Sequence, residues 1–210
     1  ISAAFATNRT CTSSTATGTT TTRGAIALIE YTIPTLSAHP YTIAKGLDGA
    51  YWFVENGGNK IGRIFTSAGT TTLTECPVPT ANADLEGITA GPTGTGLWFT
   101  EAGANQIGNI TLTGTTATFN EYPVLTAGAY PVNIVTGPDG NVWFTEQNAS
   151  QIGRITTGAT PTVTEYTGLT ANSGPLGIVS VGTNLWFTEP WVDQIGTITT
   201  GATPTATEYT

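Results

Sequence analysis

Short apolar segments alternate with turn residues along the whole chain, and their pattern repeats. A Trp-Phe segment occurs four times, as YWFVE, LWFTE, VWFTE and LWFTE, with tryptophans at Trp52, Trp98, Trp143 and Trp186. The tryptophans are 46, 45 and 43 residues apart, and each segment is followed by Ile-Gly-x-Ile and later by a Glu-Tyr or Glu-Cys pair. Self-similarity near this period, built from short β-type segments, is typical of the blades of a β-propeller.

Each repeat divides into four predicted strands. In the third repeat these are 132–137, 141–146, 151–156 and 162–167. Asp-Gly or Thr-Gly pairs separate the first two strands of the first three repeats, where tight hairpins need positive φ. The pattern therefore predicts an all-β propeller of four-stranded blades within residues 25–210. The predicted blades span about 41–79, 86–123, 131–167 and 175–210.

The N-terminal part does not follow the four-strand pattern. Residues 1–24 are a threonine-rich extension, and residues 25–33 predict a surplus strand with its own Glu30-Tyr31 pair. Three interpretations are open. Residues 1–33 form a degenerate fifth blade, the chain is part of a larger ring, or the surplus strand and the terminal edge pair with neighbouring molecules. Unpaired strand edges are templates for strand addition, so the third interpretation predicts copies of the chain as partners.

Charge and composition exclude several classes of partner. The chain has a net charge of −8 with only six Lys and Arg, so it lacks the basic cluster that nucleic acid or an anionic membrane surface requires. No apolar run approaches the roughly 20 residues of a membrane span. Only 10% of the residues are charged, against about 25% in ordinary globular domains. This composition favours an extracellular or cell-surface protein.

Two cysteines and three Asn-x-Ser/Thr triplets bear on that location. A disulfide between Cys11 and Cys76 would tie the threonine-rich extension to the first blade, and the alternative is two separate buried thiols. Asn8, Asn109 and Asn148 are the candidate glycan acceptors, with Asn8 and Asn148 favoured.

The repeated acidic residues have two interpretations. In the structural one, the glutamates of the Trp-Phe-x-Glu segments and of the Glu-aromatic pairs accept hydrogen bonds from backbone N–H groups of loops. In the functional one, the first set gathers near one face and holds a divalent cation. That set is Glu55, Glu101, Glu146 and Glu189.

Three further residues stand outside the repeat. Trp191, beside Asp193, is a candidate for recognition of a ligand such as a glycan, or else an anchor of its loop or an interface residue. His39 is the only histidine, and it is either a general base or an ordinary polar loop residue.

The segment GPDGNVWFTEQNASQIGRIT (137–156) carries a specific resemblance. Together with the same pattern over about residues 25–210, it resembles the streptogramin (virginiamycin B) lyase family. That resemblance implies a seven-bladed propeller, a catalytic histidine just before the Gly-Ile of an inner strand, and glutamates that hold Mg²⁺. The positions that match the histidine are occupied by Tyr41, Glu86, Val132 and Leu176. The resemblance therefore implies the scaffold more than the reaction.

Three functions are consistent with these residues. The first is a non-catalytic extracellular propeller that self-assembles, in its sharpest form into a filament by strand exchange, or binds a partner, with no cofactor. The second is a Mg²⁺-dependent lyase that uses His39 with Glu55. The third is a carbohydrate-binding module that uses Trp191.

Overall fold

The computed structural model describes residues 6–23 and 26–210, and the fold within them is all β. Four antiparallel sheets follow one another as blades. The first blade contains β5 (Pro40–Lys45), β6 (Tyr51–Glu55), β7 (Lys60–Ser67) and β8 (Thr70–Pro77). The second contains β9 (Leu85–Ala90), β10 (Leu97–Glu101), β11 (Gln106–Thr113) and β12 (Thr116–Pro123). The third contains β13 (Pro131–Thr136), β14 (Val142–Glu146), β15 (Gln151–Ile155) and β16 (Val163–Tyr166). The fourth contains β17 (Ile178–Val181), β18 (Asn184–Glu189), β19 (Gln194–Thr199) and β20 (Ala206–Tyr209).

The N-terminal segment runs along the outside of the first two blades. Its first two strands, β1 (Thr7–Thr10) and β2 (Thr12–Thr15), pair with the outer strands β12 and β8, so both blades have five strands. The next two, β3 (Gly18–Arg23) and β4 (Ile26–Tyr31), form a separate two-stranded sheet. The described N-terminal residues therefore pair elsewhere and do not build a four-stranded fifth blade.

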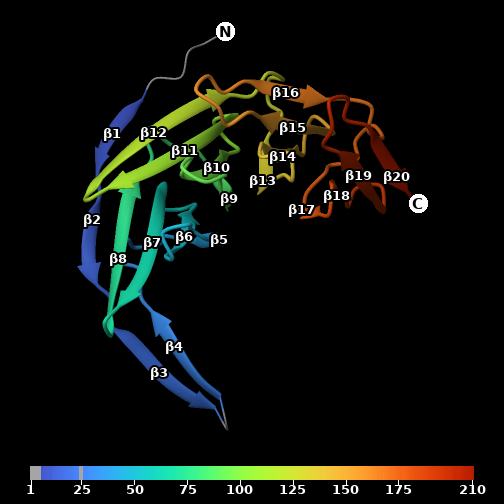
Figure 1. The fold of residues 1–210 in the computed structure, drawn as a ribbon. Coiled ribbons are helices and arrows are strands. Elements are labelled where there is room, and N and C mark those ends of the chain that lie inside the picture. Colours follow the sequence, from blue (N-terminus) through green and yellow to red (C-terminus); the bar gives the residue numbers. More distant parts are fainter. Residues whose placement is uncertain (1–5, 24–25) are drawn as a thin grey trace.

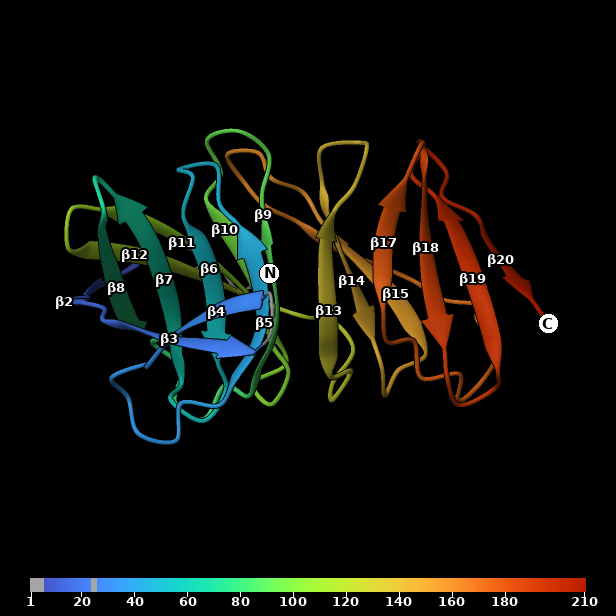
Figure 2. The ribbon, with the colours of Figure 1, turned by 90° about the horizontal axis from the view of Figure 1, so that it is seen from below.

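The blades are arranged in an open arc. Figure 1 shows the β3–β4 hairpin at one end of the arc and β20 at the other, and Figure 2 shows the blades side by side. Among the described residues, no helix is long and apolar enough to cross a membrane.

The Ile-Gly-x-Ile pattern has a steric cause. Within each blade the glycine lies opposite the phenylalanine of the Trp-Phe segment, as Gly108 lies opposite Phe99. A Cβ atom at Gly108 would lie 2.1 Å from the ring of Phe99, and the glycines of the other three blades are equally close to theirs. Only a residue without a side chain lets the ring lie flat over the third strand.

The blades pack through two different faces. Successive residues of a strand point to opposite sides, so each blade has a face with its tryptophan and a face with its phenylalanine. We call these the trailing face and the leading face. The trailing face of each of the first three blades packs on the leading face of the next, and three hydrophobic clusters result. Trp98, for example, shares a cluster with Phe144 of the third blade.

Candidate functional site

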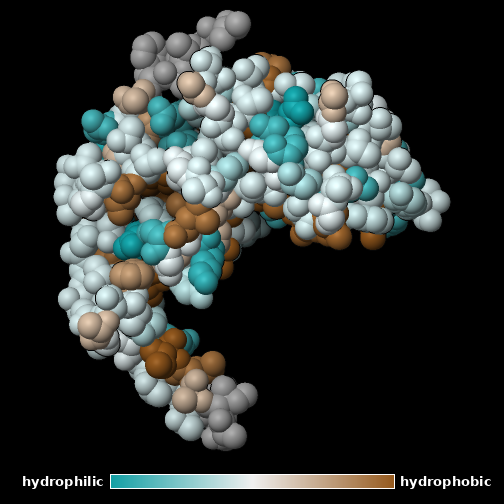
Figure 3. All heavy atoms as spheres, in the orientation of Figure 1, coloured by the Kyte–Doolittle hydropathy of each residue, from teal (hydrophilic) through white to brown (hydrophobic). Residues whose placement is uncertain are grey.

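Among the described residues, one face at each end of the arc has no blade packed against it. At the start, the leading face of the first blade exposes Tyr41, Tyr51 and Ile43, of which Ile43 is 65% exposed. At the end, the trailing face of the fourth blade exposes Val179, Trp186 and Ile195. Figure 3 shows hydrophobic surface along the hairpin and on the underside of the fourth blade.

The open trailing face is the same surface that is buried in the preceding blades. Trp186 is 39% exposed and Ile195 is 50% exposed, whereas the corresponding Trp143 and Ile152 of the third blade are fully buried. The same positions are therefore buried where a following blade is present and exposed where the described residues contain none.

The open leading face contains two hollows that the N-terminal hairpin borders. A cavity of about 330 Å³ lies among Phe53, Ile64 and Leu73, and one of about 470 Å³ lies beside Tyr51. Tyr31 of β4 lines both hollows, and its hydroxyl accepts a hydrogen bond from Thr71 at 3.4 Å. The hairpin therefore covers only part of this face.

The four positions that the resemblance assigns to a catalytic histidine come together in the structure. Tyr41, Glu86, Val132 and Leu176 line one cavity of about 350 Å³ at the ends of the four innermost strands. The cavity contains one carboxyl group, that of Glu86, whose pKa is raised by burial and by the nearby Asp84.

Asp84, the other acidic residue near this cavity, is held in a hydrogen-bond network. The oxygens of Asp84 accept hydrogen bonds from the Asn56 side chain at 2.8 Å and from the hydroxyl of Tyr130 at 2.7 Å. This bond raises the pKa of Tyr130 to about 12, so the tyrosine remains a donor at neutral pH. Glu86 is therefore the one acidic residue in the cavity lining. A single carboxyl group does not make up the set of glutamates that the resemblance implies for Mg²⁺.

His39 lies away from this cavity's lining. Its side chain is exposed in the loop before β5, and its backbone has a φ of 45°. The carbonyl of His39 accepts a hydrogen bond from Asn56, next to Glu55, but the Glu55 carboxyl is fully buried. That His39 and Glu55 act together in a reaction stays a prediction.

The repeated glutamates form one carboxyl pair in each blade. An inner glutamate, from Trp-Phe-x-Glu, lies beside the outer glutamate of the Glu-Tyr or Glu-Cys pair. The inner carboxyl groups are fully buried and, among the described residues, make no hydrogen bond of ordinary geometry. The hydroxyl of Ser173 lies near Glu189 and opposes the rise of its pKa. The pairs are Glu55 with Glu75, Glu101 with Glu121, Glu146 with Glu165, and Glu189 with Glu208.

Burial favours the protonated form of the inner member of each pair. It raises the pKa of Glu101 to about 9, those of Glu55 and Glu146 to about 8, and that of Glu189 to about 7. The nearby outer carboxylate adds to each rise. A protonated carboxyl is a donor, so each pair can share one proton.

The outer glutamates fasten the loop that enters their own blade. Each accepts a hydrogen bond from a threonine backbone N–H, as Glu165 does from Thr126 at 2.8 Å. The other threonine N–H groups, at 2.6–3.2 Å, are those of Thr35, Thr80 and Thr170. The outer glutamates thus accept the hydrogen bonds from loop N–H groups that the structural interpretation predicts, and the inner glutamates do not.

The inner glutamates do not gather around one point. Each lies in its own blade, and the described residues contain no group of three or more His, Cys, Asp or Glu side chains that could hold a metal ion. The arrangement seen is four separate carboxyl pairs, which the spacing of the repeat did not predict.

The recognition candidates of the fourth blade lie in the turn between β18 and β19. Trp191 is exposed, and its ring packs on Gly174, where a Cβ atom would be 2.3 Å away. Its backbone N–H donates to Ser173 at 3.2 Å. Asp193 is exposed with a φ of 58°. These contacts anchor the turn, and a ligand at this position stays a prediction.

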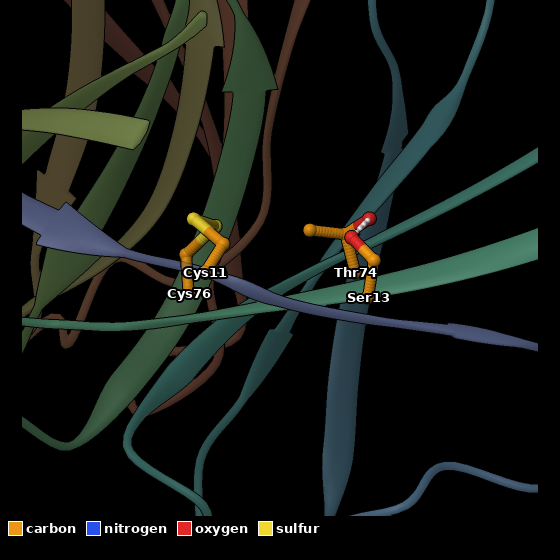
Figure 4. Close-up of a disulfide and its surroundings, with 4 residues drawn as sticks. All are labelled: Cys11, Ser13, Thr74 and Cys76. Carbon is orange, nitrogen blue, oxygen red and sulfur yellow. Dashed lines mark hydrogen bonds between the residues drawn. A yellow bond between two sulfur atoms is a disulfide. The ribbon is translucent and has the colours of Figure 1, made fainter. Parts of the chain in front are cut away.

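Cys11 and Cys76 form a disulfide between the junction of β1 with β2 and the strand β8. Figure 4 shows this disulfide with the neighbouring hydrogen bond of 2.9 Å between the hydroxyls of Ser13 and Thr74. The threonine-rich segment is therefore fixed to the first blade both covalently and through its backbone.

The three glycosylation candidates differ in accessibility. Asn8 and Asn148 are exposed. Asn109 is 6% exposed, and its amide nitrogen donates to the carbonyls of Thr95 and Leu97 at 2.6 and 3.0 Å. Of the three candidates, Asn109 does not fit a glycan in this fold, because its amide nitrogen is buried and hydrogen-bonded.

A family model and three similar solved structures indicate the same family. The sequence matches the virginiamycin B lyase family over residues 6–210. A streptogramin B lyase structure is 38% identical, with a TM-score of 0.77, covering 87% of this chain and 58% of the other. A virginiamycin B lyase from Staphylococcus aureus is 40% identical, with a TM-score of 0.75, covering 86% and 59%.

A third similar structure contains a ligand. It is a catalytically inactive virginiamycin B lyase variant from Staphylococcus aureus with quinupristin, 38% identical, with a TM-score of 0.75, covering 88% and 60%. The chain thus spans 58–60% of the length of these proteins.

Proposed function

The chain belongs to the virginiamycin B lyase family, and from this premise we propose that it is a non-catalytic member whose copies assemble head to tail. The trailing face of the fourth blade of one copy packs on the leading face of the first blade of the next. The observation that carries this proposal is the pair of open faces. They are the two halves of a junction that the chain already makes three times internally.

The chemistry of the two faces supports the match. Each internal junction joins a buried tryptophan to a phenylalanine-bearing face. The open ends expose Trp186 on one side and Ile43 on the other, with Phe53 buried beside Ile43. Burial of these apolar side chains favours association. Lys45 lies opposite Tyr51 on the leading face, so its ammonium group has to stay at the water-facing edge of the junction.

The curvature of the arc supports an open assembly. Four blades correspond to 58% of the matched streptogramin B lyase. Two copies that continue the same curvature would therefore exceed one turn of that propeller. A heterologous contact that does not close on itself gives a filament. The Cys11–Cys76 disulfide supports an oxidising, extracellular location for it.

The test uses two variants that each block one end. Trp186→Glu places a charge on the trailing face, and Ile43→Glu places one on the leading face. We expect the wild-type chain to form large species in light scattering and electron microscopy, and each variant alone to remain monomeric. A mixture of the two variants should form a dimer with twice the 21.7 kDa of one chain, because one intact face of each kind remains.

The matched control is Leu125→Glu, which changes an apolar residue that is 68% exposed and lies between the second and third blades. It should assemble like the wild type. A wild-type chain that stays monomeric, or a mixture that forms no dimer, would contradict head-to-tail packing.

A lyase reaction is the second candidate, and the family match favours it. The cavity at Tyr41, Glu86, Val132 and Leu176 contains no imidazole, because His39 is the only histidine in the sequence. We therefore expect no cleavage of quinupristin in chromatography, with or without added Mg²⁺. Cleavage that is lost in His39→Ala or Glu86→Gln would overturn the non-catalytic assignment.

A further inference from the structure

We propose that β4 of one copy serves as the outer strand of the preceding copy's fourth blade, where it takes the place of β20. The inference rests on the proposed head-to-tail packing and specifies the strand that completes the junction. Its evidence is the register of the N-terminal hairpin, the position of β4 and the side chains that β4 carries.

The register of the hairpin is that of an outer blade edge. In the first blade, β2 is added outside β8 so that Thr12 lies opposite Glu75. In the hairpin, β3 is paired with β4 so that Thr19 lies opposite Glu30. Glu75 and Glu30 are the same position of the repeat. The hairpin therefore corresponds to the fourth strand and the added strand of a blade, and the described residues supply no inner strands for it.

The position of β4 matches this interpretation. In the internal junctions, the tyrosine of an outer strand packs on the leading face of the following blade, as Tyr122 and Tyr166 do. Tyr31 lies in the same way against the leading face of the first blade, beside Ile43 and Ile64. β4 thus already lies where the outer strand of a preceding blade belongs, and head-to-tail packing would bring the neighbour's β19 beside its free edge.

The side chains of β4 fit β19 better than those of β20 do. In each blade, one outer-strand residue lies opposite the second isoleucine of Ile-Gly-x-Ile and points toward the preceding blade. In the fourth blade this residue is Ala206, opposite Ile198. The larger residues at this position in the other blades are Leu73, Phe119 and Val163. The matching residue of β4 is Leu28, which is 50% exposed in its own chain.

Exchange would also preserve the polar contacts of the blade. Tyr209 stacks on Trp186 with ring centroids 5.7 Å apart, and Tyr31 occupies the same place in the pattern. Glu208 pairs with Glu189 and binds the N–H of Thr170, and Glu30 would take over both roles. The exchange therefore adds apolar burial at Leu28 without leaving a buried polar group unpaired.

Crosslinking tests the register of this pairing. By the pattern of the fourth blade, in which Thr197 lies opposite Thr207, Ile29 of one copy would lie opposite Thr197 of the preceding copy. One chain carries Ile29→Cys and a mass tag, and the other carries Thr197→Cys. Under mild oxidation we expect at least about tenfold more mixed dimer than with Thr199→Cys. Only position 197 holds the sulfur atoms together at a high effective concentration.

A non-covalent measurement accompanies the crosslink. Leu28→Ala should weaken assembly about tenfold, because it removes the side chain that exchange buries. Leu36→Ala, at a residue that is 93% exposed, is the matched control and should have no effect. If the Trp186→Glu and Ile43→Glu chains pair but no 29–197 crosslink forms, strand exchange is refuted and face packing stands. If no association occurs at all, both proposals are refuted.

Discussion

The second and fourth blades share one repeat but differ in their surroundings. The second blade packs on both faces, and β1 covers its outer edge. Its third and fourth strands have eight residues each. The fourth blade packs on one face only, its outer edge is bare among the described residues, and β20 has four residues.

The internal geometry of the two blades is nevertheless the same. The ring centroids of Trp98 and Tyr122 are 5.8 Å apart, and those of Trp186 and Tyr209 are 5.7 Å apart. Trp98 is 2% exposed and Trp186 is 39% exposed. The repeat thus specifies the sheet, whereas the neighbours decide how much of its apolar surface is buried.

Trp98 and Trp186 should differ most in how much their removal lowers the free energy of unfolding. Trp98→Ala removes a side chain from a closed junction and should lower the free energy of unfolding by about 3–5 kcal/mol. Trp186→Ala should lower it by about 1–2 kcal/mol, since that ring is already partly in water. Urea unfolding measures both, at concentrations where the chain is monomeric. Equal losses would show that the open face is not open in solution.

The disulfide stabilises the outer edge of the first blade, and the fourth blade has no such link among the described residues. Replacing Cys11 and Cys76 by alanine should cost about 2–4 kcal/mol, because the bridge closes a loop between residues 65 positions apart. Hydrogen exchange should then rise in β1, β2 and β8 and stay unchanged in β18 and β19. A uniform rise across all blades would instead mean that the N-terminal strands stabilise the whole arc.

The all-β propeller architecture was predictable, because tryptophan and glycine recur at one spacing in every blade. The pairing of β1 and β2 was not. Their threonine-rich residues are mostly exposed, so no apolar pattern points to a partner. Backbone pairing, the Cys11–Cys76 disulfide and the Ser13–Thr74 hydrogen bond hold the register, and of these only the cysteines can be seen in the sequence. The Glu30-Tyr31 pair was the signal available for the role of β4, since it repeats an outer-strand pattern outside the four blades.

The candidate site was predicted less well than the fold. The spacing of the glutamates shows that they repeat, but not which two carboxyl groups meet. That pairing depends on strand register, which places Gly108 of the third strand opposite Glu121. The accessibility of Asn109 depends in the same way on which strand edge its side chain meets, and a sequence triplet does not contain that information.

The smallest effect concerns the carboxyl pairs and their dependence on pH. The pKa of Glu101 is about 9 in the fold, well above the ordinary value of 4.5. The folded state therefore holds a proton that the unfolded chain has released, and stability falls as the pH rises from about 4.5 toward 9. For Glu189, in the open blade, the pKa is about 7, so its contribution is lost over a narrower range.

Replacing either residue by glutamine keeps a donor for the outer carboxylate and removes the ionisation. At pH 9, Glu101→Gln should be more stable than the wild type by at least about 1 kcal/mol, and Glu189→Gln by less. Near pH 5 both should match the wild type. At concentrations where the chain is monomeric, Glu30→Gln, on an exposed strand, should match it throughout. Thermal unfolding across this pH range measures the difference. Wild-type stability that rises with pH would show that the pairs do not share a proton, and that the enclosed and open blades do not differ in this respect.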